Sequence, residues 1–379
     1  MRVVVVGAGL AGASVVEELR ERGFDGEIVL LGAESHLPYE RPPLSKDVLL
    51  GKKETGDAVV HDADWYAAHD VEVHTGTEAR SIDRERKVVV TEAGEHPYDA
   101  LVLATGCEPR RFPLADESGR PVHYLRTIED SAALRRALTD GARVVVVGAG
   151  WIGLEVAAAA RQAGARVTVL ESADLPLLGV LGPEVAERFA ELHRSHGVDL
   201  RLGTTVTAED LAEADVVVVG VGVVPRTALA EAAGLDVDNG VLVDDRLRTS
   251  DPDILAVGDI ANEQHPVLGR RIRVEHWDTA IKHGKAAAAT ILGADEPYTR
   301  RPYFFTDQYD LGMEYWGSVG PDGYDRVLTT GDFSGAFRAW WIRDDVVVAA
   351  MQANDWDAAD EMRASVGQPP PEASATSGT

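Results

Sequence analysis

The sequence is poorest in cysteine, with a single residue, Cys107, among 379. One thiol excludes an intramolecular disulfide framework, and it excludes any Cys-x-x-Cys pair for redox or metal chemistry. No histidine neighbours Cys107 in the sequence, so a small buried thiol is its expected role rather than a nucleophile. We therefore expect no metal site, and a cytoplasmic protein is the default.

Positive charge is also scarce, with 37 Lys and Arg against 63 Asp and Glu and a formal net charge of −26. Nucleic acids and anionic membranes are therefore not expected as partners. The sequence contains no run long and apolar enough for a membrane span. The apolar stretch 3–16 could pass for a signal peptide, but its glycine spacing and the strand and helix that follow explain it better.

The first motif is a glycine-rich loop that follows four valines, 3–6, which are typical of a buried parallel strand. Its glycines keep the order G-x-G-x-x-G: Gly7, Gly9 and Gly12. A helix is predicted over 13–22. The three glycines would allow a tight turn, a close backbone approach to a pyrophosphate and close packing of the helix. A second strand, 27–31, ends near Glu34, whose carboxylate could accept hydrogen bonds from a ribose hydroxyl.

The same pattern returns 141 residues later, after valines 144–147. The glycines of this second loop are Gly148, Gly150 and Gly153, and a strand over 167–170 ends on Glu171. Two such units predict two bound dinucleotides or a duplicated scaffold. A carboxylate at Glu171 would repel a 2′-phosphate, and no Lys or Arg lies between 172 and 187 to receive one. NADH is therefore expected rather than NADPH.

Other segments are expected at the carboxyl ends of the predicted strands, where ligands bind in such folds. The proline-rich loop 36–47 carries Arg41 and Lys46, which are candidates for phosphate or flavin contacts; a solvated surface loop is the alternative. A buried strand over 98–103 runs into the turn Ala104-Thr105-Gly106. Another strand ends in Gly258-Asp259, where an acid can accept hydrogen bonds from a polyol, and a helix is predicted over 279–292. An aromatic-rich α+β region with antiparallel strands follows residue 300.

Together, the two glycine loops, the 41–46 segment, the 104–106 turn and Gly258-Asp259 resemble the FAD-dependent ferredoxin and rubredoxin reductases. These belong to the pyridine nucleotide-disulfide oxidoreductase superfamily, as does apoptosis-inducing factor, and they lack the redox disulfide. The resemblance implies an α/β fold with two Rossmann-like dinucleotide-binding domains, the second inserted in the first, and a C-terminal α+β domain. The expected ranges are 1–112 and 243–303 for the FAD domain, 113–242 for the NADH domain, 304–366 for the C-terminal domain and 367–379 for a disordered tail.

The resemblance also implies which residues bind the two cofactors. FAD would be held by Gly7, Gly9, Ala11, Gly12, Glu34, Arg41, Lys46, Ala79, Ala104, Thr105, Gly106, Arg110, Gly258, Asp259, Trp277 and Phe305. NADH would be held by Gly148, Gly150, Ile152, Gly153, Glu171 and Gly222. Lys46 and Glu155 would form a catalytic pair close to flavin N5, unless Glu155 is an ordinary helix-surface acid. Phe305 stands where the family often has a tryptophan over the flavin.

No cysteine lies between 34 and 60, so the thiol route of the disulfide reductases is closed. Electrons would leave the flavin directly, which predicts an NADH:ferredoxin oxidoreductase serving an oxygenase or cytochrome P450 chain. One alternative keeps the fold and reduces a small molecule such as monodehydroascorbate or a quinone. Another is a non-catalytic flavoprotein that senses NADH through partner binding.

The acidic net charge predicts long-range repulsion from a ferredoxin, which is usually acidic. A local basic patch would then be needed for docking, and a solvated charge run is the alternative interpretation. The candidates for this patch are Arg270, Arg271, Arg273, Arg300 and Arg301. A monomer or weak homodimer is expected.

Overall fold

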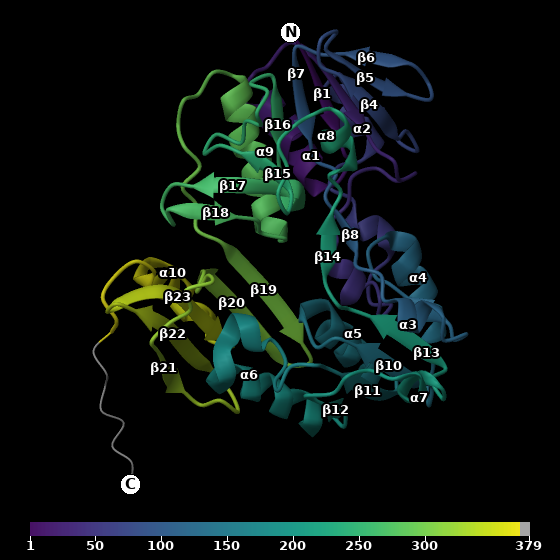
Figure 1. Cartoon of the computed structure of the whole chain (residues 1–379), viewed down its shortest axis with the longest axis vertical. Coiled ribbons are helices and arrows are strands. Elements are labelled where there is room, and N and C mark those ends of the chain that lie inside the picture. Colours follow the sequence, from purple (N-terminus) through teal and green to yellow (C-terminus); the bar gives the residue numbers. More distant parts are fainter. Residues whose placement is uncertain (372–379) are drawn as a thin grey trace. The chain divides into compact units, whose positions relative to one another are not determined.

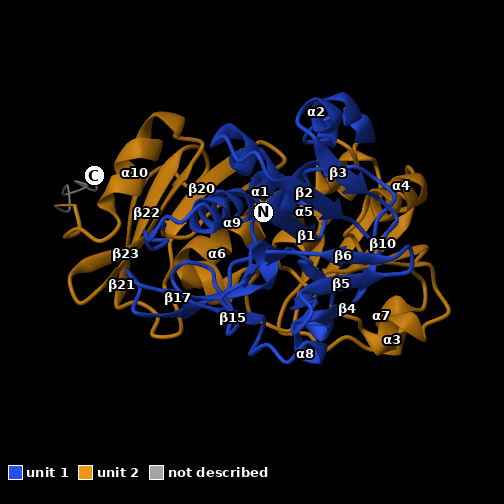
Figure 2. Cartoon of the chain, turned by 90° about the horizontal axis from the view of Figure 1, so that it is seen from above, with its two compact units in different colours: residues 1–43, 53–109, 223–300 blue, residues 44–52, 110–222, 301–379 orange. Residues whose placement is uncertain are grey.

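The computed structural model describes residues 1–371, which form two compact units built from separate segments of the chain (Figure 2). Unit 1 comprises Met1–Pro43, Lys53–Pro109 and Val223–Arg300. Unit 2 comprises Leu44–Lys52, Arg110–Gly222 and the described residues from Arg301 onward. Within the described residues, no helix has both the length and the apolar character needed to cross a membrane.

Unit 1 is centred on a parallel sheet with the strand order β16-β7-β1-β2-β3. Its strands are β1 (Arg2–Val6), β2 (Glu27–Leu31), β3 (Val71–His74), β7 (Ala100–Leu103) and β16 (Ile254–Ala256). Figure 1 labels the strands β1, β7 and β16 of this sheet. Valines 3–6 are nearly inaccessible to solvent, as the unbroken β-branched run predicts for a strand covered on both faces. Helices α1 (Leu10–Glu21) and α9 (Trp277–Ile291) pack together so closely at Gly284 that an added Cβ would lie 2.6 Å from the Cβ of Ser14.

Smaller elements complete unit 1. One sheet consists of the antiparallel strands β4 (Ala79–Asp83), β5 (Val88–Thr91) and β6 (Glu95–Pro97). A mixed sheet contains β15 (Val241–Val243), β17 (Ala261–His265) and β18 (Arg270–Ile272), in which β15 and β17 are parallel. Strand β8 (Cys107–Pro109) pairs with β14 (Val223–Pro225). Its short helices are α2 (Ala63–Ala68), α8 (Ala228–Ala232), η2 (Thr55–Ala58) and η3 (Gly258–Ile260). The proline-rich segment contains one 3-10 turn, η1 (Pro42–Ser45), consistent with prolines preventing a longer helix. Cys107 is buried, as expected.

Unit 2 repeats the parallel design with the order β12-β11-β10-β13-β9. The strands are β9 (Val122–His123), β10 (Arg143–Val147), β11 (Arg166–Leu170), β12 (Asp199–Arg201) and β13 (Val216–Val219). The helices are α3 (Pro113–Asp116), α4 (Ile128–Ala137), α5 (Trp151–Gln162), α6 (Leu178–Ser195) and α7 (Ala208–Leu211). In both units a glycine loop leaves the central valine strand, which pairs in parallel with the next strand along the chain. The predicted pair of Rossmann-like units is confirmed.

The C-terminal part of unit 2 is an antiparallel sheet with the order β19-β20-β23-β22-β21. Its elements are β19 (Tyr303–Gln308), β20 (Leu311–Gly317), β21 (Arg326–Gly331), β22 (Phe337–Arg343), β23 (Val346–Ala353), η4 (Trp356–Ala358) and α10 (Ala359–Ser365). The predicted α+β region is therefore present. Gly367 and Gln368, at the start of the predicted tail, form backbone hydrogen bonds with Val347, and 372–379 lie outside the described residues.

The predicted ranges of the FAD, NADH and C-terminal domains stay a prediction. Both parallel sheets contain the strands that the sequence assigned to them. The compact units are a coarser division, because the antiparallel sheet belongs to the same unit as the second parallel sheet. The short segment Leu44–Lys52 also belongs to unit 2, although the sequence assigned it to the first domain.

Helix α6 is joined to the antiparallel sheet by two buried polar contacts. Trp341 Nε1 donates to the carbonyl of Leu181 at 2.9 Å, beside a kink where Gly182 has a φ of 71°. His193 Nε2 lies 2.8 Å from Gln308 Oε1, and both residues are at most 1 % exposed. Burial lowers the pKa of His193 to about 4, so its imidazole is neutral near pH 7.

The buried His193 predicts an acid-sensitive fold. The unfolded chain binds a proton at this residue more readily than the folded chain, so its contribution to stability is complete above about pH 6.5 and is lost as the pH falls toward 4. The variant H193Q should flatten the fall in unfolding free energy over this window by up to about 3 kcal/mol. Urea unfolding at a series of pH values measures it, with H74Q as the control at a half-buried histidine. An unchanged pH slope in H193Q would contradict the assignment.

Candidate functional site

The first glycine loop connects β1 to α1 with a geometry that larger residues would prevent. A Cβ added at Gly7, whose φ is 115°, would lie 2.2 Å from the carbonyl oxygen of Ala104, and one at Gly12 would lie 2.1 Å from that of Gly7. A Cβ at Gly9 would meet nothing within 4 Å. The loop is therefore closely packed at its first and third glycines and open at the second, as a backbone that receives a pyrophosphate requires.

The amino end of α1 is available to an anion. Gly9 occupies the N-cap position without a side-chain hydrogen bond, and the first turn contains no acidic residue. The first N–H groups of a helix lack partners inside the helix and carry a partial positive charge. This end of the helix therefore fits the phosphates of a dinucleotide.

The second glycine loop, between β10 and α5, has the same features. A Cβ at Gly148, whose φ is 98°, would lie 2.6 Å from the oxygen of Gly220, and one at Gly153 would lie 2.1 Å from that of Gly148. Gly150 caps α5 without a side-chain bond, and the first turn has no acid. Ile152, in this turn, is 44 % exposed although it is apolar. This loop also fits a dinucleotide.

Glu171 follows β11 and binds the second glycine loop directly. Its Oε2 accepts a hydrogen bond from the backbone N–H of Ala149 at 2.7 Å, and its Oε1 accepts one from Ala173 at 2.9 Å. The structure thus brings the predicted ribose-binding acid to the loop. Gly222, another predicted NADH contact, has a φ of 97° that favours glycine, and its carbonyl accepts a hydrogen bond from the N–H of Arg110.

In unit 1, Glu34 is fixed by neighbours from the proline-rich loop. It accepts hydrogen bonds from Tyr39 Oη at 2.5 Å and from Arg41 Nη2 at 2.7 Å. Burial opposes the charge of Arg41, but the nearby Tyr39, Glu34 and Asp259 raise the pKa of its guanidinium above its usual range. Three predicted FAD residues, Glu34, Arg41 and Asp259, are therefore close enough to interact electrostatically.

Other predicted FAD residues of unit 1 also meet around the first loop. A Cβ at Gly258, whose φ is 71°, would lie 3.0 Å from the Cβ of Ala11. Thr105 Oγ1 donates to the carbonyl of Arg226 at 3.0 Å, which fixes the 104–106 turn beside Gly7.

Two further predicted FAD residues of unit 1, Trp277 and Ala79, lie at the starts of a helix and a strand. Trp277 begins α9 and donates through Nε1 to Glu40 at 3.0 Å. Ala79 begins β4 in a separate antiparallel sheet. Their predicted contacts with FAD stay predictions, as do those of the unit 2 residues Lys46, Arg110 and Phe305.

Within unit 2, Lys46 and Glu155 form an ion pair, with Lys46 Nζ 2.8 Å from Glu155 Oε1. Glu155 is only 5 % exposed, so it is not an ordinary helix-surface acid. Glu155 is one of the buried residues of α5, and a buried carboxylate must be met by donors. The ring of Phe305 lies 5.5 Å from the same ammonium.

Two hydroxyl groups that the sequence analysis did not identify complete this site. Ser45 Oγ donates to Glu155 Oε2 at 2.5 Å, and Thr306 Oγ1 donates to Oε1 at 2.6 Å. Both adjoin residues that were identified, since Ser45 precedes Lys46 and Thr306 follows Phe305. Asp307 lies nearby, where burial raises the pKa of its carboxyl although Lys46 opposes the rise.

The predicted docking arginines have structural contacts of their own. Arg271 Nη1 donates to the carbonyls of Val243 and Asn262 at 3.0 and 2.8 Å. Arg273 is 9 % exposed and pairs with Glu275 at 2.7 Å. Arg300 pairs with the buried Asp278. The docking role of all five arginines stays a prediction.

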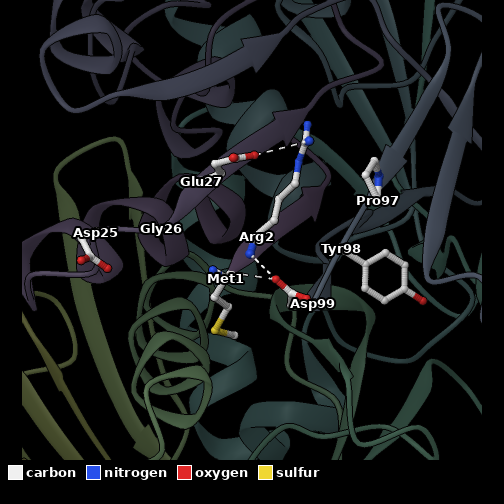
Figure 3. A pocket seen from close by; sticks show the side chains of 8 residues that line it. All are labelled: Met1, Arg2, Asp25, Gly26, Glu27, Pro97, Tyr98 and Asp99. Carbon is white, nitrogen blue, oxygen red and sulfur yellow. Dashed lines mark hydrogen bonds and ion pairs between the residues drawn. The ribbon is translucent and has the colours of Figure 1, made fainter.

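A pocket of about 450 Å³ lies at the other end of the unit 1 sheet (Figure 3). Arg2, at the amino end of β1, pairs there with Glu27 at 3.4 Å, and its backbone N–H donates to Asp99. The glycine loop leaves the carboxyl end of the same strand. The pocket is therefore separate from the candidate dinucleotide site.

Comparisons with known proteins agree with this geometry. Residues 1–284 match the family model described as pyridine nucleotide-disulphide oxidoreductase. The chain is 42 % identical to the ferredoxin–NAD(+) reductase component of the anthranilate 1,2-dioxygenase system of Burkholderia cepacia, covering 97 % of this chain and 95 % of that protein. It is 37 % identical to putidaredoxin reductase of Pseudomonas putida, covering 93 % and 88 %.

Solved structures support the same relationship. The reductase in the covalent putidaredoxin reductase–putidaredoxin complex matches with a TM-score of 0.89 and 37 % identity, covering 96 % of this chain and 91 % of that one. Fdr9 matches with a TM-score of 0.90 and 38 % identity, covering 98 % and 96 %. The chain therefore belongs to the pyridine nucleotide-disulphide oxidoreductase family and, within it, to the ferredoxin and rubredoxin reductases that its motifs resemble.

Proposed function

We propose that this protein is an NADH-dependent flavoprotein reductase that passes electrons through FAD to a ferredoxin-type iron–sulfur protein. The acceptor would belong to an oxygenase or cytochrome P450 system. One relative is named as a component of an anthranilate dioxygenase system and another as a putidaredoxin reductase. The observation that carries the proposal is the buried Lys46–Glu155 pair in a chain with two open glycine loops.

FAD, when bound, supplies the exchange between two-electron donation by NADH and one-electron acceptance by an iron centre. The chain itself supplies binding and electrostatics. In unit 1, the amino end of α1 receives the pyrophosphate, Glu34 the ribose, and Asp259 the polyol chain. Arg41, held charged by its neighbours, offsets the negative charge of these groups and of the phosphates.

Lys46 supplies a positive charge where the flavin becomes electron-rich. Glu155 fixes the direction of the ammonium, because the two groups form a charge-assisted contact of 2.8 Å. The cost of burying both charges is offset by the two hydroxyl donors on the carboxylate. Phe305 supplies an apolar wall in place of the family's tryptophan.

All five predicted docking arginines stay candidates, and the exposed Arg301 is the one chosen for a charge-reversal test. Charge changes at Arg271, Arg273 or Arg300 would disturb contacts within unit 1. With a net charge of −26, local cations are needed to bring an acidic ferredoxin into contact. Such charges act mainly on the association rate and lose effect as salt is added.

Glu171 sets the nucleotide preference in this proposal. Its carboxylate faces the second glycine loop, so kcat/KM with NADH should exceed that with NADPH in ferricyanide reduction. E171Q keeps the shape and removes the charge, and should reduce the NADH preference by about tenfold. A wild-type kcat/KM for NADPH equal to or above that for NADH would show that Glu171 does not have this role.

The acceptor is tested by NADH-driven reduction of ferredoxins and rubredoxins, followed by stopped-flow spectroscopy. R301E should slow ferredoxin reduction about threefold at low salt and leave ferricyanide reduction unchanged. R80E, at an exposed arginine of β4, is the matched control. Equal losses in both assays would exclude a docking role for Arg301.

The same assays separate the alternative functions. Fast turnover with a quinone or monodehydroascorbate alone would favour a small-molecule reductase, and slow turnover with every acceptor would favour the NADH-sensing alternative.

A further inference from the structure

We propose that Thr306 and Gln308 are positioning residues that hold Glu155 through a buried, one-directional hydrogen-bond chain. The chain begins at His193 on α6, crosses β19 and ends on the carboxylate in α5. This inference deepens the proposed function and rests on the role proposed there for the Lys46–Glu155 pair.

The chain is continuous within unit 2. His193 Nε2 lies 2.8 Å from Gln308 Oε1, and Gln308 Nε2 lies 3.3 Å from Thr306 Oγ1. Thr306 Oγ1 lies 2.6 Å from Glu155 Oε1. The histidine, glutamine and threonine are each at most 1 % exposed. Water therefore cannot replace a lost partner, and every link must be satisfied by the protein.

The carboxylate sets the direction of every link. An ionised carboxylate only accepts hydrogen bonds, so the single hydroxyl hydrogen of Thr306 is donated to Glu155. Thr306 can then only accept from Gln308, which places the amide NH₂ toward Thr306 and the amide oxygen toward His193. His193 must therefore carry its hydrogen on Nε2.

The contact made by the other ring nitrogen of His193, Nδ1, is consistent with this hydrogen-bond direction. Its Nδ1 is then an acceptor, and the hydroxyl of Tyr309 lies 3.5 Å from it, at the outer limit of a hydrogen bond. Because burial holds the pKa of His193 down near 4, the ring stays neutral and keeps this tautomer near pH 7. All donors in the chain thus point toward Glu155.

Such a chain orients the carboxylate but does not conduct protons. A proton arriving at the amide oxygen of Gln308 could continue only if the amide itself changed tautomer. The aligned donors instead polarise one another, which strengthens the last bond to the carboxylate. Glu155 is then held at Oε1 by Thr306 and Lys46 and at Oε2 by Ser45, so its direction, and that of the ammonium, is fixed.

The test compares T306V, which keeps the shape and removes the donor, with T306S, which keeps the donor. In the FAD-loaded protein, T306V should slow flavin reduction by NADH about tenfold, change KM for NADH by less than about twofold, and lower the flavin midpoint potential. T306S should restore the rate of flavin reduction to within about twofold of wild type, and it should restore the midpoint potential. T290V, which removes a hydroxyl bond to the carbonyl of Arg246 in unit 1, is the matched control and should match wild type.

A second readout is independent of turnover. Nitrogen NMR of protein labelled at the histidine and glutamine side chains should show wild-type His193 as the Nε2–H tautomer, and T306V should shift the resonances of the Gln308 amide. A wild-type Nδ1–H tautomer would contradict the direction of the chain. A T306S protein as slow as T306V would reduce Thr306 to a packing role and overturn the inference.

The variant K46M separates this inference from the proposed function. If K46M slows flavin reduction and lowers the potential while T306V matches wild type, Glu155 needs no positioning by Thr306, and the proposed function stands. If K46M itself matches wild type, the role proposed for the Lys46–Glu155 pair is wrong.

Discussion

A buried carboxylate must be surrounded by hydrogen-bond donors, and at Glu155 this requirement joins three segments of unit 2. The acid sits on the buried face of α5, where burying a charge without partners would cost several kcal/mol. Its donors come from Ser45 and Lys46 in the Leu44–Lys52 segment and from Thr306 on β19. One acid therefore connects the short segment Leu44–Lys52 and the antiparallel sheet to the second Rossmann-like fold.

In the two glycine loops, steric constraints leave no room for a side chain at certain positions. At the third glycine of each loop, an added Cβ would lie 2.1 Å from a backbone oxygen, which no side-chain rearrangement can relieve. The middle glycines face open space or nearly so. The helices behind them have uncapped amino ends, so both units present backbone N–H groups and partial positive charge to phosphates. The closely packed glycines and the unbonded N–H groups at the start of each helix therefore both fit the binding of a dinucleotide phosphate.

Much of this could be predicted from the sequence, because local patterns determine it. Valine runs, glycine spacing and the acids Glu34 and Glu171 correctly placed both parallel sheets and both loops, and the family is confirmed. Ser45, Thr306 and Gln308 were missed because a hydroxyl or amide acquires a role only through contacts between residues distant in sequence. Likewise, charge alone suggested five docking arginines, and only the structure shows that Arg271, Arg273 and Arg300 are engaged in unit 1. The cofactor contacts of the individual residues stay predictions.

The central claim is that electrons leave the flavin directly, since the chain has one cysteine and therefore no dithiol to store a second pair. Anaerobic titration of the FAD-loaded protein with NADH, followed by flavin absorbance, tests it most directly. Full reduction at about one NADH for each FAD is the predicted result, because the flavin alone then takes up two electrons. A requirement for about two equivalents would reveal a further electron store and contradict the claim.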